Sequence, residues 1–429
     1  MAQGDGSAWQ AQQLLATVTC RMHVCFVIPF AMENSLRFAR AAVALPGVRL
    51  SLVSQDPIER FPADLREVAI GYERVVDALK PELLAAVVER LGARLGPVAR
   101  LVGILEPLQE SLAAVRERLR IRGMDAQTAR NFRDKGRMKD LFAADNVPCA
   151  RHRLCASLGE AEGFVREVGF PVVGKPPAGA GAKATSRLAD HAALAEFVGA
   201  MRPAPGRGVL LEEFVTGREF SFDSVTLHGL HIFHNVCCYH PTPLQVMENP
   251  WIQWTVVLPR DLSGPEFADI HRVGPRALSM LGMWNGMSHM EWFRRADGSI
   301  AIGEVAARPP GAQFMSLMSL VTDVDMYRAF AELMVFETFT PPPRRFAAGA
   351  AYLRGQGGGA DAAIRAVHGL DAVRADLGDI VVEVKAPQVG KPKAATYEGD
   401  GYVLCRHPDT AVVERAVQHI VRTVRVETA

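Results

Sequence analysis

The Asp297-Gly298 dipeptide is the feature that most constrains how this chain can fold. It lies within residues 286–306, where apolar residues alternate with polar ones on both sides of it. An Asp-Gly pair in this setting predicts a β-hairpin with a two-residue type I′ turn, because both central positions of that turn need a positive φ. The register that follows from this turn places Glu291 directly opposite Glu304.

Two facing glutamates predict a cation between them. Like charges about 5 Å apart across a ladder destabilise a sheet unless something positive lies between them. Mg²⁺ takes oxygen ligands and keeps positions for phosphate and water. The alternatives are a solvated sheet edge or a one-residue slip that separates the pair. The apolar neighbours Met290, Trp292 and Ile302 argue against a fully solvated face.

Arg308 follows Glu304 by four residues, so both side chains are expected on one face of an extended strand. A guanidinium beside a metal and phosphate site would hold anionic oxygens in a bidentate manner. The alternative is a simple Glu–Arg salt bridge, and the spacing does not separate the two.

The composition is that of a globular chain. It has 429 residues, of which 49% are hydrophobic and 22% charged, and 48 basic residues balance 47 acidic ones. This excludes a disordered tail, a collagen-like chain and a highly basic nucleic-acid binder. We see no signal peptide and no apolar run that could span a membrane, and the seven cysteines include no C-x-x-C pair. We therefore expect a cytoplasmic protein.

The pattern along the chain predicts about three domains. A strand at 22–28, a helix at 34–45 and a strand at 48–54 indicate a parallel βαβ unit. Further on we expect a helix over 131–145, a Pro-rich linker at 340–343 and a final helix near 408–422. The predicted division is an N-terminal extension (1–20) and three domains (21–130, 131–340 and 341–429).

A second group of polar residues lies between 172 and 219. Lys175 ends an apolar strand and precedes a loop of small residues that contains Gly181 and Lys183, whose backbone N–H groups could cradle phosphates. The loop is not a Walker A motif, and a flexible linker is the alternative. Residues 209–227 read as two strands joined at Thr216-Gly217, with acidic residues Glu212, Glu213 and Glu219 along them.

The order of these residues resembles the ATP-grasp superfamily over about residues 130–340. The resemblance implies an α/β (α+β) fold, with an N-terminal Rossmann-like domain, a central ATP-grasp domain and a small C-terminal α/β lid domain. The cofactors that it implies are ATP and Mg²⁺ (or Mn²⁺). It also implies roles for individual residues: phosphate contacts from Lys139, Lys175, Gly181 and Lys183, an adenine border of Glu212, Glu213, Phe214 and Val215, a ribose contact from Glu219, and metal ligation by Glu291 and Glu304.

The activity implied by the resemblance is the ATP-dependent joining of a carboxylate to an amine through an acyl phosphate, with Arg308 as a catalytic residue. The run Glu304-Val305-Ala306-Ala307-Arg308 resembles the L-amino-acid (dipeptide) ligases. Ala306 stands where many members of the superfamily carry Asn, so one metal ligand is missing and either one or two ions could bind. The implied partners are small carboxylates and amines, without nucleic acid or membrane, in a possible homodimer.

Two alternatives to an amide-forming ligase stay open. One is a biotin-carboxylase-like or formate-using relative, and the other is a nucleotide-binding protein without catalysis. His289 is a candidate base or a packed strand histidine. Residues 239–254 form either a substrate loop or a surface excursion. The run from Gly355 to Ala360 fits G-x-G-x-x-A, but too little chain follows for a dinucleotide domain, so we expect a turn and a helix start there.

Overall fold

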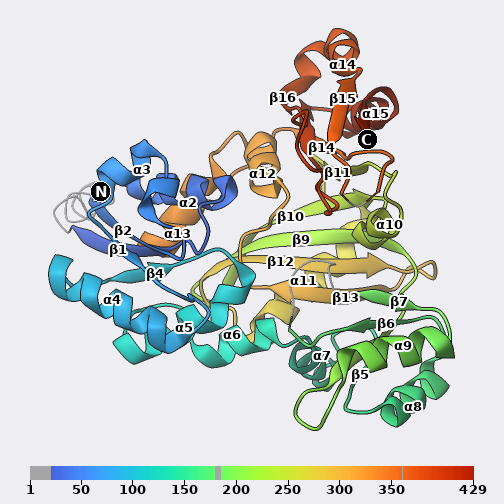
Figure 1. Ribbon diagram of the computed structural model, residues 1–429, viewed down its shortest axis with the longest axis horizontal. Coiled ribbons are helices and arrows are strands. Elements are labelled where there is room, and N and C mark those ends of the chain that lie inside the picture. The colour runs from blue at the N-terminus through green and yellow to red at the C-terminus, as the bar shows by residue number, and fades with distance from the viewer. Residues whose placement is uncertain (1–20, 179–184, 360) are drawn as a thin grey trace, which may run out of the picture.

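The computed structural model describes residues 21–178, 185–359 and 361–429. The predicted extension at 1–20 lies outside the described residues. The described residues form one long central sheet of eight strands, two four-stranded sheets beside it and a two-stranded sheet (Figure 1). No helix among them is both long and apolar enough to cross a membrane.

The N-terminal part is a four-stranded parallel sheet of order β3-β2-β1-β4. Its strands are β1 (Met22–Val27), β2 (Val48–Ser54), β3 (Gly71–Arg74) and β4 (Arg100–Val102). Its main helices are α2 (Glu33–Val43), α3 (Ala63–Val68), α4 (Pro81–Leu95) and α5 (Gln109–Leu119). The predicted βαβ unit is confirmed, since β1 and β2 pair in parallel. The sequence pattern missed β3 and β4, because strands this short show no periodicity of their own.

A small antiparallel sheet of order β5-β8-β6-β7 follows. Its strands are β5 (His152–Cys155), β6 (Val172–Lys175), β7 (Ser186–Leu188) and β8 (Val209–Glu213), and its helices are α8 (Leu158–Val168) and α9 (His191–Met201). The single helix predicted over 131–145 is in fact the end of α6 (Ala126–Arg133) followed by α7 (Lys135–Ala144). The break is at Asp134, whose side chain caps α7 by accepting a hydrogen bond from the Arg137 N–H at 3.0 Å.

The central sheet has eight strands in the order β13-β12-β9-β10-β11-β14-β17-β16. Their bounds are β9 (Arg218–Leu227), β10 (Leu230–His240), β11 (Trp254–Leu258), β12 (Gly286–Arg294), β13 (Ile300–Ala306), β14 (Ala347–Leu353), β16 (Val381–Lys385) and β17 (Gly401–His407). β14 pairs with β11, so the sheet continues across the predicted boundary at 340. The division into domains stays a prediction.

The C-terminal part completes the fold around β14, β16 and β17. It contains β15 (Ile364–His368), α14 (Leu370–Leu377), α15 (Thr410–Thr423) and β18 (Arg425–Thr428). The predicted final helix is confirmed by α15. The helix start predicted after Gly355 is wrong, because the glycine turn leads into β15, which pairs with β18.

The strands predicted over 209–227 are both present, yet they do not pair with each other. β8 belongs to the small sheet and β9 to the central one. The linker from Phe214 to Gly217 therefore crosses from one sheet to the other, which places it between two layers of the fold.

The two faces of β9 and β12 differ in character. Phe220, Phe222, Met290 and Trp292 are buried on one face and pack in a core that includes α11 (Ala268–Leu281). Acidic and other polar residues alternate with them and point to the opposite face.

Three histidines pack beside Phe222 on the apolar face. The rings of His231 and His234 stack on it, and the ring of His271 from α11 lies 4.5 Å from that of His234. Burial, followed by repulsion from His271, lowers the pKa of His231 to about 4 and that of His234 to about 3. These rings are therefore neutral at neutral pH.

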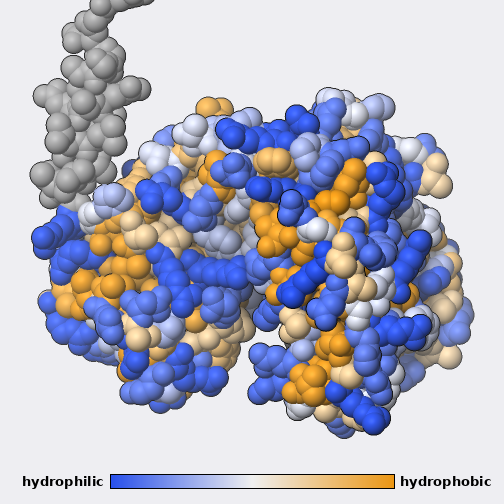
Figure 2. Space-filling model, turned by 90° about the horizontal axis from the view of Figure 1, so that it is seen from above, coloured by the Kyte–Doolittle hydropathy of each residue, from blue (hydrophilic) through white to orange (hydrophobic). Residues whose placement is uncertain are grey.

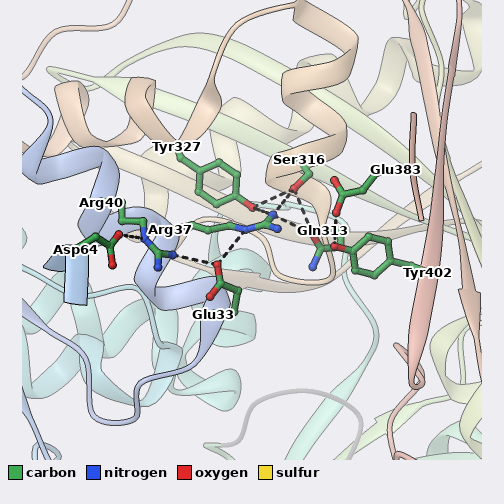
Figure 3. A network of polar contacts seen from close by, with 9 residues as sticks. All are labelled: Glu33, Arg37, Arg40, Asp64, Gln313, Ser316, Tyr327, Glu383 and Tyr402. Atoms are coloured by element: carbon green, nitrogen blue, oxygen red, sulfur yellow. Dashed lines mark hydrogen bonds and ion pairs between the residues drawn. The ribbon is translucent and has the colours of Figure 1, made fainter. Parts of the chain in front are cut away.

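A polar network joins the N-terminal and C-terminal halves of the chain (Figure 3). Arg37 from α2 donates to Ser316 Oγ at 3.1 Å and to Gln313 Oε1 at 3.4 Å, at the start of α12 (Phe314–Thr322). It also approaches Tyr327 of α13 (Met326–Phe336), and α13 packs on α2. The network thus holds the segment that follows Arg308 against helix α2 of the N-terminal part.

Candidate active site

The predicted hairpin is present and Glu291 faces Glu304 in the ladder, but the turn differs from the prediction. Gly298 has a φ of 85°, whereas Asp297 is not among the described residues with positive φ, so the turn is not type I′. Arg295 N–H donates to Ser299 O at 2.8 Å, and the Gly298 N–H donates to Arg295 O at 3.0 Å. The turn therefore spans residues 295–299.

A β-bulge restores the predicted pair. Next to the turn Trp292 pairs with Ile302, which is one residue away from the predicted register. Gly303 is then an extra residue on β13, and beyond it Glu291 again faces Glu304. A Cβ atom on Gly303 would lie 3.1 Å from the Phe293 ring and 3.2 Å from Glu291 O, so glycine suits this position.

The glutamate pair lies on the wall of a cavity of about 540 Å³. Its lining comes from the N-terminal, central and C-terminal parts of the chain. Seen from above, a notch divides the molecular surface into two lobes, and hydrophilic and hydrophobic residues interleave around it (Figure 2). The predicted site residues on the wall are Lys175, Glu212, Glu213, Phe214, Val215, Glu219, Glu291, Glu304 and Arg308. Gly181 and Lys183 lie outside the described residues.

Glu212 is the centre of a buried ion-pair cluster. Its Oε1 lies 2.8 Å from Lys175 Nζ and 3.3 Å from Lys139 Nζ. Lys139 is fully buried, and it also donates to the carbonyl of the bulge residue Gly303 at 2.9 Å. Burial raises the pKa of Glu212, but the two lysines together lower it below its ordinary value. Lys175 reaches the cavity, whereas Lys139 supports its wall from behind.

Lys135 is a third lysine at this end of the site, and the sequence analysis did not single it out. Its Nζ lies 2.7 Å from Glu304 Oε1, and its side chain is 8% exposed. It is the first residue of α7, directly after the capping Asp134. That Asp-Lys step at a helix start was the available signal, and the expectation of one continuous helix concealed it.

The two facing glutamates have different electrostatic environments. Burial raises the pKa of Glu291, and the charge of Glu304 raises it further. Burial also raises the pKa of Glu304, but Lys135 and Lys175 bring it below its ordinary value. The pKa of Glu219 is raised well above its ordinary value by burial and then by Glu291. A divalent cation beside Glu291 would favour the ionised form of all these carboxyls.

The linker between the two sheets forms one edge of the cavity. Phe214 and Val215 follow β8 directly and lie half-buried on the wall. Glu213 is tied to Arg151 at 2.6 Å and to Arg295 at 2.9 Å, which fixes the start of the linker. An apolar edge of this kind suits a planar base.

Arg308 pairs with a carboxylate from the N-terminal part of the chain rather than with Glu304. Its Nη2 lies 3.1 Å from Glu106 Oε2, and Arg133 holds the other oxygen of Glu106 at 3.0 Å. Glu106 was missed by the sequence analysis. Its signal was a position shortly after β4, because ligand-binding residues gather at the carboxyl ends of parallel strands.

His289 lines the cavity on β12, two residues before Glu291 and on the same face of the strand. Its Nδ1 lies 2.5 Å from Asp223 Oδ1 on β9, and Ser221 donates to the other oxygen of Asp223 at 2.8 Å. His289 is therefore more than a packed strand histidine, because its ring also faces the cavity and Asp223 fixes its orientation.

Four aromatic side chains, here called the aromatic wall, and a loop from the C-terminal part line another part of the cavity. The aromatic wall consists of Tyr239, Trp254, Phe314 and Tyr397. Trp254 lies 5.4 Å from Tyr239, 6.2 Å from Phe314 and 4.8 Å from Tyr397, measured between ring centroids. All four rings line the cavity, and so does Glu398. Residues 239–254 thus contribute to the cavity wall through Tyr239, Trp254 and helix α10 (Pro243–Glu248). Tyr397 and Glu398 gave no signal in the sequence, because their position depends on the packing of the C-terminal strands.

Comparison with known proteins identifies the architecture. No protein-family model matches the chain. The crystal structure of an L-amino acid ligase from Bacillus licheniformis superimposes with a TM-score of 0.77, at 17% identity, over 95% of this chain and 99% of that one. The chain has the ATP-grasp fold. The expected ATP-grasp fold class is thus confirmed.

Other ATP-grasp proteins agree with this result. The biotin carboxylase domain of 2-oxoglutarate carboxylase from Hydrogenobacter thermophilus, in complex with MgADP and bicarbonate, matches with a TM-score of 0.69 at 17% identity, over 94% of this chain and 90% of that one. The L-arginine-specific L-amino acid ligase of Bacillus subtilis is 21% identical over 57% of this chain and 59% of its own length. The chain spans little more than half the length of the curated relatives that head the comparison.

The donor set around the glutamate pair fits the magnesium that the ATP-grasp fold implies. Glu291 and Glu304 present hard oxygen ligands on one wall, and burial together with the charge of Glu304 raises the pKa of Glu291. Within the described ranges no group of three or more His, Cys, Asp or Glu side chains has the arrangement of a metal site. A two-carboxylate site of this kind needs phosphate and water to complete its coordination.

Proposed function

We propose that this protein is an ATP-dependent carboxylate–amine ligase that forms an amide or peptide bond on an amino acid or a small carboxylic acid. The observation that carries the proposal is the Glu291–Glu304 pair, which shares one cavity wall with Lys175 and Arg308. The comparison with L-amino acid ligases supports the same reaction class.

In the proposed reaction the γ-phosphoryl group of ATP passes to an oxygen of the substrate carboxylate, giving ADP and an acyl phosphate. The amine nitrogen then attacks the carbonyl carbon, the C–O bond to phosphate breaks, and the nitrogen loses a proton. The protein mainly positions the reactants and stabilises charge in such a transfer.

Named side chains would divide this work. Glu291 and Glu304 would hold Mg²⁺ (or Mn²⁺), which supplies charge neutralisation for the phosphates when bound. Lys175, and Lys183 beyond the described residues, would bind phosphate oxygens, while Lys139 and Lys135 hold the carboxylates in place. Arg308, oriented by Glu106, would hold the reacting carboxylate or the oxyanion.

The nucleotide would lie along the sheet linker. Phe214 and Val215 would border the adenine, and Glu219 would accept a hydrogen bond from the ribose. Ala306 leaves two glutamates as the metal ligands, so we propose one tightly held ion. We also propose a cytoplasmic homodimer that acts on small molecules.

ADP release with pooled amino acids, measured with and without bicarbonate, tests the proposed function. We expect release that depends on amino acids and on Mg²⁺, with a new amide product visible by mass spectrometry. Release with bicarbonate alone would instead indicate a carboxylating enzyme. Binding of ATP without release under any condition would indicate a nucleotide-binding protein.

A further inference from the structure

The Glu398 carboxylate is a half-buried charge that faces the cavity without a protein partner. It makes no hydrogen bond and no ion pair with any residue that the structure describes. Burial raises the pKa of Glu398, while the charges of Arg308 and Lys385 lower it. A carboxylate that loses water without gaining a cation destabilises the protein unless a ligand supplies the cation.

The loop that carries Glu398 is fixed rather than free. The next residue, Gly399, has a φ of 64°, and a Cβ atom there would lie 2.5 Å from Leu353 O, so this turn requires glycine. Asp400 then accepts from Ala394 N–H at 2.6 Å and from Gly355 N–H at 3.1 Å. The fold therefore holds Glu398 at the cavity in one place.

The surroundings of Glu398 suit a cationic group. Its neighbour Tyr397 belongs to the aromatic wall with Tyr239, Trp254 and Phe314. Aromatic faces attract ammonium and guanidinium groups, most strongly where water is excluded. Arg308 lowers the pKa of Glu398 by its charge, but its ion pair is with Glu106 and not with Glu398.

We propose that Glu398 and the aromatic wall form a subsite for a positively charged nitrogen group on the substrate. This inference rests on the proposed ligase function and narrows its substrate. The acid that is activated carries an ammonium or guanidinium group, as an amino acid does, and plain monocarboxylic acids and dicarboxylic acids are excluded. An anionic tail in this subsite would be repelled by Glu398, which adds selectivity against such acids.

Calorimetric titration of the full-length protein, preloaded with MgADP, tests the subsite without requiring turnover. The probes are hexanoate, L-norleucine, 6-aminohexanoate and L-lysine. We expect at least one ammonium-bearing probe to bind about tenfold or more tightly than hexanoate. Preference for L-norleucine assigns the subsite to an α-ammonium group, and preference for 6-aminohexanoate assigns it to a cation at the end of a side chain.

The variant Glu398→Gln should lose this preference while its affinity for hexanoate and MgADP stays unchanged. Glu414→Gln is the matched control, because Glu414 is an exposed carboxylate on α15 of the same region. Equal binding of all four probes by the natural protein, absence of binding by all four, or a preference that survives in Glu398→Gln would each overturn the proposal. ADP release separates the two hypotheses: a Glu398-dependent preference without release with any acid would refute the ligase and leave the subsite standing.

Discussion

The two faces of strands β9 and β12 carry opposite kinds of residue at alternating positions. On the cavity face, Glu219, Asp223 and Glu291 keep charged or hydrogen-bonding groups close together. On the face toward α11, Phe222 and Trp292 are fully buried in an apolar core. Neighbouring residues of one strand therefore have different roles, one in the site and one in the core. A substitution on each face should separate an effect on activity from an effect on stability.

The largest expected effect is on activity, at Glu291. Glu291→Gln should lower amino-acid-dependent ADP release about 1000-fold, because a neutral amide is a poor ligand for Mg²⁺. The melting temperature should stay unchanged or rise, since the variant removes a like charge beside Glu304. Calorimetric melting and steady-state kinetics on the same sample check both parts. Normal release, or a large loss of stability, would contradict the assignment.

Trp292, the next residue on β12, should show the reverse. Its side chain is fully buried and stacks on Phe220 at 4.5 Å, so Trp292→Ala should cost about 3–5 kcal/mol in free energy of unfolding. The protein that remains folded should bind MgADP within about threefold of normal. Urea unfolding and nucleotide titration measure the two effects. A variant that keeps its stability but loses nucleotide affinity would refute the division between faces.

Glu212 should link stability and activity, because it lies where the cavity wall meets the core. Glu212→Gln leaves the buried ammonium groups of Lys139 and Lys175 without their carboxylate, and we expect a loss of about 3 kcal/mol in free energy of unfolding. The neighbouring Glu213→Gln breaks ion pairs with Arg151 and Arg295, both of which reach solvent, and should cost about 1 kcal/mol. Equal losses of free energy of unfolding in the two variants would show that burial does not make the Glu212 ion pairs more important for stability than the exposed ones of Glu213.

A pH-dependent effect concerns the histidines on the apolar face. The pKa values of His231 and His234 are about 4 and about 3 in the folded protein, below that of a free histidine. The unfolded chain therefore takes up protons first as the pH falls below about 6.5, and stability falls by up to about 1.4 kcal/mol per pH unit for each ring until the folded pKa is reached.

Urea unfolding between pH 7 and pH 5 measures this slope. The double variant His231→Leu/His234→Leu should have a flatter slope than the natural protein. His368→Gln, at an exposed position, should leave the slope unchanged. An unchanged slope in the double variant would mean that these rings are not held neutral by burial.

Local patterns in the sequence carry much of the fold. The alternation and turn residues around Asp297-Gly298 predicted the hairpin, and the βαβ unit and the last helix followed from periodicity alone. The predicted pairing of Glu291 with Glu304 was also correct, although the structure reaches it through two departures from the prediction that cancel each other. The turn is longer than predicted, and the bulge at Gly303 returns the register. A bulge reflects packing, here against Phe293, which no local pattern reports.

The sequence by itself pointed to most of the charged side chains that line the central part of the cavity, because charged residues at strand ends and strand faces stand out locally, although it missed Lys135. Only the tertiary structure decided what surrounds them. Glu106 reaches Arg308 and Glu398 reaches the same cavity from segments about 200 and 90 residues away along the chain. The central sheet brings these segments together, since β14 pairs with β11 and carries the C-terminal loop to the aromatic wall. Such contacts arise from packing between distant strands, and periodicity along one strand contains no information about them.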